Sequence, residues 1–279
     1  MKIFRTAMLL AVTAMVFLCS CQPEIDAPDV PEVIGKFEVS VLKVGQADAI
    51  ILQTIQHCVV IDCGETDDGD EVSEYLAKNR ISNVDYLFVT HFDKDHVGGV
   101  PEVLDNVTVG ELVAPAYKGN VDEYDRYLEA IEKHNITPIE LTENMTFTLD
   151  DVLFEVYPPM KTVYAEDDNN FSLVISATHG DNRFLFAGDA KKVRLAEVVN
   201  QINGTYNFLK VPHHGKYNSY SMSFFKTVKP EISVITCSDK NPEEEETIAA
   251  LKSVGSSVYL TKDGNVYAVS DGKKITVEQ

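Results

Sequence analysis

The chain has 279 residues, of which 44% are hydrophobic and 24% are charged, so it is long enough to bury one large core. Its formal net charge is −20. Because affinity for nucleic acid comes largely from Lys and Arg side chains that neutralise phosphates, this charge disfavours a protein that holds long DNA or RNA, although a local basic cleft would be compatible with it.

The N-terminus has the pattern of an export signal. A basic segment over residues 1–5 precedes an apolar run over 7–18, which has the length of a signal peptide and is too short to span a bilayer comfortably. The sequence Leu-Cys-Ser-Cys at 18–21 then resembles the bacterial lipoprotein box, with Cys21 as the lipidated first residue of the mature chain. An ordinary cleaved signal peptide is the alternative.

These features divide the chain into three predicted parts. Residues 1–21 are a lipoprotein signal peptide, residues 22–35, with three prolines and four acids, are a flexible tether, and residues 36–279 are one folded domain. No other apolar run in the sequence is long enough to span a membrane, so we expect the lipid to be the only membrane anchor. The protein is then expected in the cell envelope, on the periplasmic side or the outer surface.

The predicted domain opens with a series of strands. Apolar and polar residues alternate over 36–44, and 48–54 is its predicted partner strand across a turn at 45–47. Further strands are predicted at 58–61, 84–89, 111–114, 136–139 and 152–157, and amphipathic helices at 70–80 and 121–134.

The second half continues this mixture of strands and helices. Strands are predicted at 169–175, 183–187, 206–211 and 232–236, helices at 192–199 and 243–254, and a closing hairpin that pairs 257–260 with 266–269. Strands mixed with helices in both halves predict a mixed α/β fold.

The most informative stretch lies directly after the apolar strand at 84–89. His91, Asp93, Asp95 and His96 place four potential metal ligands within six residues. Two glycines and a short apolar helical pattern follow, so the four side chains are expected on a turn between a strand and a helix. Neutral imidazole together with carboxylate suits Zn²⁺, Mn²⁺ or Fe²⁺. The alternative is a polar loop whose side chains face water.

Two later strands also end in potential ligands. Asp189 follows the strand at 183–187, and His213 and His214 follow the strand at 206–211. A two-metal hydrolase needs ions about 3.5–4 Å apart and a ligand shared between them. Asp189 suits the shared carboxylate, with a turn aspartate as the alternative, and His214 or His213 suits one of the ions.

These segments resemble a known family. The stretch from His91 to His96 resembles the H-x-[HD]-x-D-H signature of the metallo-β-lactamase fold, and its H-x-D-x-D-H form is similar to one branch, the metallo-hydrolase domain of the competence protein ComEC. Resemblance to that domain covers nearly all of residues 37–279. It includes Val-Gly-Gln-Ala-Asp-Ala-Ile at 44–50, Asn-Asn-Phe-Ser-Leu-Val at 169–174, Phe-Leu-Phe-Ala-Gly-Asp at 184–189 and Leu-Lys-Val-Pro-His-His-Gly at 209–215.

The resemblance implies an αββα sandwich, in which two mixed sheets are flanked by helices. It also implies a hydrolase that cleaves phosphodiester bonds, as a nuclease or phosphodiesterase, through a hydroxide activated by two divalent ions, Zn²⁺ or Mn²⁺. The expected metal ligands are His91, Asp93, Asp95, His96, Asp189, His213 and His214. Three of these residues, Asp95, Asp189 and His214, are also expected to act in catalysis.

Two further carboxylates are expected near the metal ligands. Asp48 is expected either to support the ligand loop as a hydrogen-bond acceptor or to cap its own turn, and Asp62 could likewise support the loop. The expected substrate is a small-molecule or cell-surface phosphodiester. Nucleic acid is compatible with the family's activity but is disfavoured by the charge.

Two positions of the chain are unusual for the fold. The histidine that most metallo-β-lactamase-fold enzymes place before Gly-Asp is missing in this branch and in this chain. Asn170 is expected in its space, which favours Mn²⁺ or loosely held Zn²⁺. The family's Gly-His-Pro is replaced by Lys240-Asn241-Pro242. The alternatives are therefore a hydrolase of another bond, such as a lactone or thioester, and a non-catalytic surface binding protein with a decayed metal site.

Overall fold

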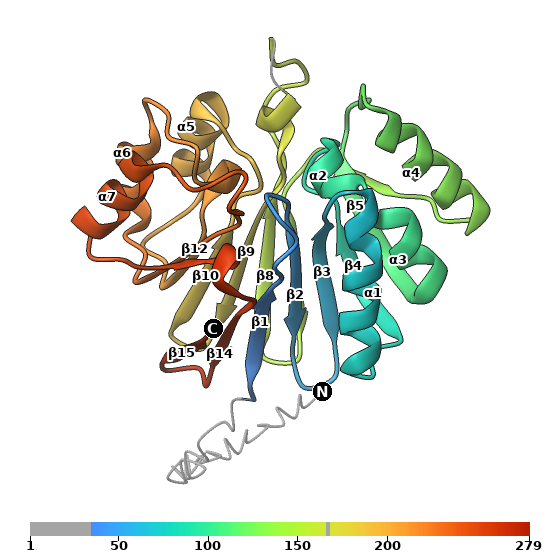
Figure 1. Cartoon of the computed structure of the whole chain (residues 1–279), viewed down its shortest axis with the longest axis horizontal. Coiled ribbons are helices and arrows are strands. Elements are labelled where there is room, and N and C mark those ends of the chain that lie inside the picture. Colours follow the sequence, from blue (N-terminus) through green and yellow to red (C-terminus); the bar gives the residue numbers. More distant parts are fainter. Residues whose placement is uncertain (1–34, 166–167) are drawn as a thin grey trace, which may run out of the picture. The chain divides into compact units, whose positions relative to one another are not determined.

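The computed structural model describes residues 35–165 and 168–279. The predicted signal peptide at 1–21 and all but the last residue of the predicted tether at 22–35 lie outside the described residues. Two β-sheets pack face to face, and helices cover their outer faces (Figure 1). This arrangement confirms the predicted αββα sandwich of two mixed sheets.

The first sheet contains eight strands in the order β15-β14-β1-β2-β3-β4-β5-β6. Neighbours from β15 to β3 pair antiparallel, and those from β3 to β6 pair parallel. The strands are β1 (Phe37–Val41), β2 (Ala49–Gln53), β3 (Cys58–Cys63), β4 (Asn83–Phe88), β5 (Thr108–Pro115), β6 (Ile139–Leu141), β14 (Val266–Ser270) and β15 (Ile275–Glu278).

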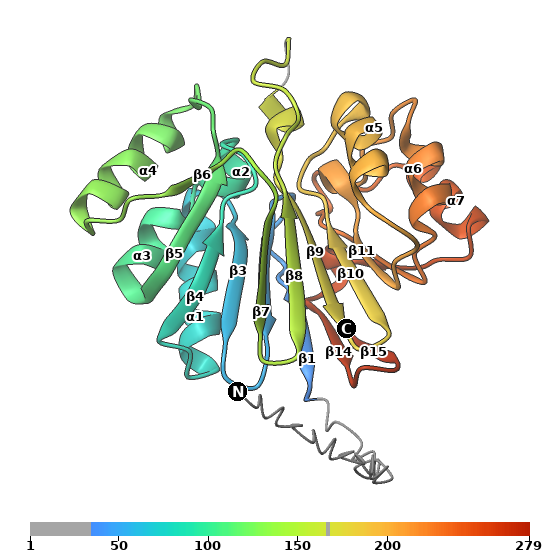
Figure 2. The same ribbon diagram turned by 180° about the vertical axis from the view of Figure 1, so that it is seen from behind.

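The second sheet contains seven strands in the order β13-β12-β11-β10-β9-β8-β7. Neighbours from β7 to β10 pair antiparallel, and those from β10 to β13 pair parallel. Figure 2 shows β7, β8 and β9 side by side from behind. The strands are β7 (Met145–Leu149), β8 (Val152–Tyr157), β9 (Val174–His179), β10 (Asn182–Phe186), β11 (Phe208–Lys210), β12 (Ile232–Ile235) and β13 (Ser257–Leu260).

The helices divide between the two outer faces (Figure 1). The first sheet carries α1 (Gly69–Lys78), α2 (Lys94–Val97), α3 (Val100–Asn106) and α4 (Asp122–Lys133), and the second carries α5 (Lys192–Gln201), α6 (Ser221–Val228) and α7 (Glu245–Ser253). Short 3₁₀ turns include η2 (Asp168–Phe171) and η3 (Pro212–Gly215). None of the helices within the described residues has the length and apolarity needed to cross a membrane.

The layer between the sheets is the central core. Phe37 on β1 meets Phe184 on β10 edge-on, with ring centroids 5.0 Å apart, and it contacts Phe154 on β8 at 6.2 Å. All three side chains are fully buried. Alternate residues along each strand face this layer, because successive side chains on a strand point to opposite sides of the sheet. The opposite faces pack against the helices in two further apolar clusters.

The predicted closing hairpin is wrong. Ser257–Leu260 pairs in parallel with β12 in the second sheet, whereas Val266–Ser270 pairs antiparallel with β1 in the first. The chain crosses from one sheet to the other between them. Val266 and Ala268 bury their side chains in the core between the sheets, a long-range contact that local alternation does not encode. The hairpin that does form joins β14 to β15, which the sequence patterns did not predict.

Other predicted elements need smaller corrections. The predicted strand at 136–139 occurs instead at Ile139–Leu141, and β7, α2 and α6 were not predicted. The omission of α2 matters for the site, because this one-turn helix carries two of the predicted ligands.

A buried arginine ties α5 to the strands beneath it. Arg194 is fully buried and donates from Nε to the carbonyl of Ser172 at 3.0 Å and from Nη2 to the carbonyl of Tyr157 at 2.7 Å. Its Nη1 donates to Gln201 Oε1 at 2.7 Å and pairs with Glu197 Oε2 at 3.3 Å. The guanidinium thus satisfies buried and partly buried groups from three segments.

Replacing Arg194 by methionine is expected to lower the free energy of unfolding by about 3–5 kcal/mol, because Glu197 loses its buried cationic partner and two carbonyls lose their donor. Urea denaturation followed by circular dichroism measures the change. In the matched control Lys78→Met, an exposed helix pair with Glu74 is lost, and the expected change is below about 0.5 kcal/mol. Equal stabilities of the two variants would contradict this role for Arg194.

Candidate metal centre

The predicted ligands follow strands that end at one edge of the sandwich, which we call the site edge. β4, in the first sheet, leads into the loop and helix that carry His91 to His96. β10 and β11, parallel neighbours in the second sheet, lead to Asp189 and to η3 with His214. Loops at the carboxyl ends of parallel strands lie next to one another, and the packing of the two sheets brings all three together.

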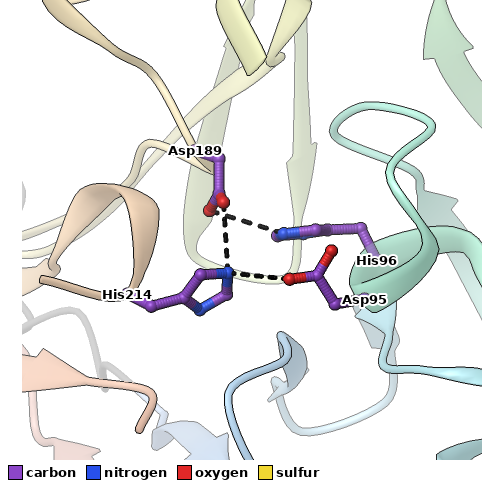
Figure 3. A group of neighbouring side chains, drawn as sticks. All are labelled: Asp95, His96, Asp189 and His214. Carbon is purple, nitrogen blue, oxygen red and sulfur yellow. Dashed lines mark ion pairs between the residues drawn. The ribbon is translucent and has the colours of Figure 1, made fainter. Parts of the chain in front are cut away.

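Four of the predicted ligands converge at this edge. Asp95, His96, Asp189 and His214 each offer one nitrogen or oxygen atom, and these atoms all lie within 4.8 Å of one another (Figure 3). His214 Nε2 lies 3.1 Å from Asp189 Oδ2 and 3.3 Å from Asp95 Oδ2. His96 Nε2 lies 3.4 Å from Asp189 Oδ1. Asp189 therefore faces both histidines, one with each carboxylate oxygen.

The converging atoms lack hydrogen bonds within the described part of the chain. His96 Nε2, His214 Nε2 and Asp189 Oδ1 are buried and have no hydrogen-bond partner there. Buried polar atoms are normally paired, because leaving them unpaired costs free energy. Two imidazole nitrogens and two carboxylates aimed at one point form a donor set that Zn²⁺ and Mn²⁺ accept. The residues therefore fit a divalent metal ion.

The other ring nitrogen of each histidine is held in place. Asp62 Oδ2 lies 2.7 Å from His96 Nδ1, and Thr236 Oγ1 lies 2.9 Å from His214 Nδ1. A partner at Nδ1 fixes the ring so that Nε2 points into the cluster, as it does around ligating histidines. Asp62 also accepts hydrogen bonds from the backbone and hydroxyl of Thr90, both at 2.7 Å.

Asp48 supports the cluster through Thr236. Its Oδ1 accepts a hydrogen bond of 2.7 Å from Thr236 Oγ1, and its Oδ2 pairs with Lys210 Nζ at 2.5 Å. Both charged side chains are almost fully buried. This geometry agrees with the expectation of a supporting acceptor, because Asp48 holds the threonine that holds His214.

The histidines and carboxylates of the cluster shift one another's pKa values. Burial opposes the charged form of every member, but Asp189 and Asp62 raise the pKa of His96 well above its ordinary value, and Asp189 is the main group that raises the pKa of His214 to about 9. Despite burial, His214 and His96 hold the pKa of Asp189 well below its usual range. The histidines thus keep the carboxylate anionic, and a cation bound here would take over that role.

His91 and Asp93 lie beside the cluster but form a separate group. His91 is fully buried, its ring centroid lies 4.1 Å from that of His96, and its Nε2 lies 3.6 Å from Asp93 Oδ2. Asn169 Nδ2 lies 3.3 Å from His91 Nε2 and 3.1 Å from Asp93 Oδ2. The expected sharing of Asp189 between this pair and a second ion therefore stays a prediction.

The asparagine beside this pair was assigned wrongly. Asn169 occupies the position expected for Asn170, whose Oδ1 instead accepts a hydrogen bond from the Arg194 backbone at 3.1 Å. Both lie on η2, where consecutive side chains point about 120° apart because a 3₁₀ turn has three residues. The Asn-Asn pair was visible in the sequence, but the turn that chooses between its members was not.

His213 and His214 occupy different positions although they are neighbours. His214 is buried in the cluster, whereas His213 is partly exposed and lines a cavity beside it. Both adopt left-handed backbone conformations, with φ of 50° and 51°. Asn241, which was expected to replace the histidine of a Gly-His-Pro motif, is exposed, and its backbone N–H donates to Ser238 Oγ at 3.1 Å.

Comparisons with known proteins point to one family. A family model described as "Metallo-beta-lactamase superfamily" matches residues 42–238. The ComE operon protein 3 of Bacillus subtilis is 30% identical over 170 residues, which cover 60% of this chain and 22% of that protein. The Recombination protein 2 of Haemophilus influenzae is 26% identical over 211 residues, 74% of this chain and 25% of that protein. These matches support the resemblance to the ComEC-type domain.

Further matches are more limited in extent or show the fold alone. A ribonuclease Z from Picrophilus torridus is 31% identical over 118 residues, 39% of this chain and 36% of that enzyme. The metallo-beta-lactamase fold protein YhfI from Bacillus subtilis superposes with a TM-score of 0.57 at 12% identity, covering 88% of this chain and 100% of that one. The matched segments span about a quarter of the ComE operon protein 3 and of the Recombination protein 2, and about a third of the ribonuclease Z.

Asp189→Ala is expected to weaken metal binding more than about 100-fold, because both histidines lose the carboxylate between them, and losing only a supporting partner already costs 10–100-fold. Inductively coupled plasma mass spectrometry after dialysis against Mn²⁺ or Zn²⁺ measures the ions retained per chain. Asp181→Ala, at an exposed turn before β10, is the matched control and should retain them. No retained metal in the parent protein would contradict the metal centre.

Thr236→Val tests the support of His214 without changing side-chain volume much. We expect metal affinity to fall 10–100-fold, since the imidazole loses the partner that orients it and Asp48 loses a donor. Competition with a fluorescent chelator measures the affinity. Thr276→Val, on the exposed edge strand β15, should match the parent protein, and an unchanged affinity in Thr236→Val would rule out the proposed orientation of His214.

Proposed function

Because the chain belongs to the metallo-beta-lactamase superfamily, whose members are typically hydrolases, we propose that it is a metal-dependent hydrolase of phosphodiester bonds. The observation that carries the proposal is the cluster of Asp95, His96, Asp189 and His214, whose buried Nε2 atoms have no hydrogen-bond partner among the described residues. The names of two kinds of relative, a ribonuclease Z and a recombination protein, support nucleotide-like phosphodiesters as the substrate chemistry.

The side chains of the cluster have different roles in the proposed reaction. A divalent ion held here would polarise a phosphoryl oxygen and lower the pKa of a water molecule, so that a nucleophile exists at neutral pH. His96 and His214, oriented by Asp62 and Thr236, provide fixed ligands. Asp189 lies between them and neutralises charge at the buried end of the site.

Asp95 is the most accessible member of the cluster. Its side chain is 22% exposed, whereas those of Asp189 and His214 are 3% or less. Substrate and water therefore approach from its side. Although burial opposes it, His214 and His96 lower the pKa of Asp95, which keeps this carboxylate anionic and able to accept a hydrogen bond from the attacking water.

The location and ion content are proposed with the activity. The leader pattern at 1–21 supports a lipid-anchored protein of the cell envelope. The neighbouring imidazole and carboxylate of His91 and Asp93, 3.6 Å apart, support a second, weaker ion, with Mn²⁺ or Zn²⁺ as the candidate metals.

Two observations favour a second candidate function. The amide of Asn169 already contacts both His91 and Asp93, and the exposed Asn241 stands where the family carries a histidine. A site altered in this way fits a surface binding protein that retains one ion without turnover. Hydrolysis of a lactone or thioester is the other alternative, and a substrate panel separates it from the main proposal.

The purified protein, supplied with Mn²⁺ or Zn²⁺, is expected to hydrolyse bis(p-nitrophenyl) phosphate, with release of nitrophenolate as the readout. Asp95→Asn should lower kcat/KM by about 10²–10⁴-fold, because the acceptor for the attacking water and one metal ligand are lost together. The matched control Asp181→Asn should behave as the parent protein.

The other outcomes identify the alternatives. Turnover of a thioester or lactone without turnover of any phosphodiester would contradict the main proposal and favour the other hydrolase. Retained metal with no turnover of any of these substrates would favour the binding protein.

A further inference from the structure

A cavity of about 400 Å³ opens beside the cluster of Asp95, His96, Asp189 and His214, which we call the metal cluster. The described residues that line it are Ala165, Asn170, Lys191, Lys192, Val193, His213, Lys216, Tyr217 and Asn218. They come from η2 and the segment before it, from the start of α5, and from η3 and the segment after it. The functions derived above do not use this cavity.

The cavity adjoins the cluster because the same loops build both. Asn170 follows Asn169, Lys191 lies two residues after Asp189, and His213 directly precedes His214. Consecutive Cα atoms are 3.8 Å apart, so each loop delivers one side chain to the metal site and another to the cavity within one or two residues. A group bound in the cavity would therefore sit next to the group bound at the metal site.

The cavity is basic on a strongly acidic protein. Three lysines line it and none of its described lining residues is acidic, although the chain as a whole carries a net charge of −20. Lys192 is exposed and forms no ion pair with any other described residue, and Lys216 pairs with Glu244 at 3.6 Å. A larger cavity beside β1 and α1, of about 550 Å³, is lined by Glu38, Glu71 and Glu74 as well as by lysines.

Local positive charge of this kind selects anions. A basic pocket concentrates anionic ligands even when the rest of the surface repels them. Lysine ammonium groups bind phosphate as point charges, and Tyr217, 37% exposed, presents an aromatic ring on which a base or another flat group can stack. The volume is that of a small-ligand site and exceeds what one phosphate needs.

Building on the proposed phosphodiesterase function, we propose that this cavity binds a second phosphate group of the substrate, adjacent to the scissile phosphodiester. The preferred substrates then carry at least two neighbouring phosphates. The acidic remainder of the surface limits productive binding to the few groups that reach the site edge, so short bisphosphorylated molecules or chain ends fit better than the middle of a long polyanion.

Two chromogenic substrates that differ by one phosphate test the proposal. Thymidine 5′-(p-nitrophenyl phosphate) carries only the scissile group, and its 3′-phosphorylated form adds the neighbouring phosphate. In the parent protein, kcat/KM should be about tenfold higher for the 3′-phosphorylated form, as expected for one added charge-assisted contact. In Lys192→Gln and Lys216→Gln this ratio should fall toward one.

Lys252→Gln is the matched control. Lys252 is exposed in the last turn of α7, a helix between the parallel strands β12 and β13, so it lies toward the edge of the sheet opposite the site edge. This variant removes the same charge and should keep the parent ratio. An effect of net charge alone would change the ratio equally in all three variants and would overturn the proposal.

A binding measurement separates this proposal from the activity on which it rests. Chelator-treated protein should bind thymidine 3′,5′-bisphosphate about tenfold more tightly than thymidine 5′-monophosphate in isothermal titration calorimetry, and both cavity variants should lose the difference. Equal affinities, together with equal turnover of the two substrates, would overturn the second-phosphate site and leave the proposed function standing. A retained affinity difference without turnover of either substrate would overturn the proposed function.

Discussion

A buried ion pair holds the two sheets in register at the site edge. Asp48 precedes β2 in the first sheet, and Lys210 ends β11 in the second, so their contact spans the sandwich. The metal cluster needs this registration, because His96 comes from the first sheet whereas Asp189 and His214 come from the second. A displacement of one sheet along the other by a single residue, about 3.3 Å, would separate the ligands. Burying two charges costs desolvation energy, and here the pair also fixes Thr236 and, through it, His214.

The charge of the chain illustrates the difference between a global and a local property. Net charge describes the field far from the surface, where it opposes the approach of polyanions. Within a Debye length, about 8 Å at physiological ionic strength, the nearest side chains dominate. The lysines around the cavity beside the metal cluster are within that distance of a phosphate bound there. An acidic protein can therefore act on anions, provided that only a small part of the substrate must come close.

The sequence indicated which candidate side chains lie close together better than it indicated how the strands are connected. His91 to His96, Asp189 and His214 were recognisable because each follows an apolar strand, and strand ends are where side chains from distant segments can meet. The distinction between Asn169 and Asn170 depended on a 3₁₀ turn, and that between His213 and His214 on two left-handed residues, neither of which has a reliable local signature. The pairing of β14 with β1 rather than β13 joins residues more than 200 positions apart, such as Phe37 and Ser270, which no local pattern can indicate.

The backbone of η3 links ligand occupancy to conformational stability. Two consecutive non-glycine residues, His213 and His214, occupy the left-handed region, at a cost of roughly 1–2 kcal/mol each. The hydrogen bond to Thr236 and the burial of the His214 ring offset part of this cost. A ligand that engages His214 adds its binding free energy to the native state, by RT ln(1 + [L]/Kd). The melting temperature thereby becomes a thermodynamic report on occupancy, which allows ligands to be ranked by thermal shift before any reaction is known.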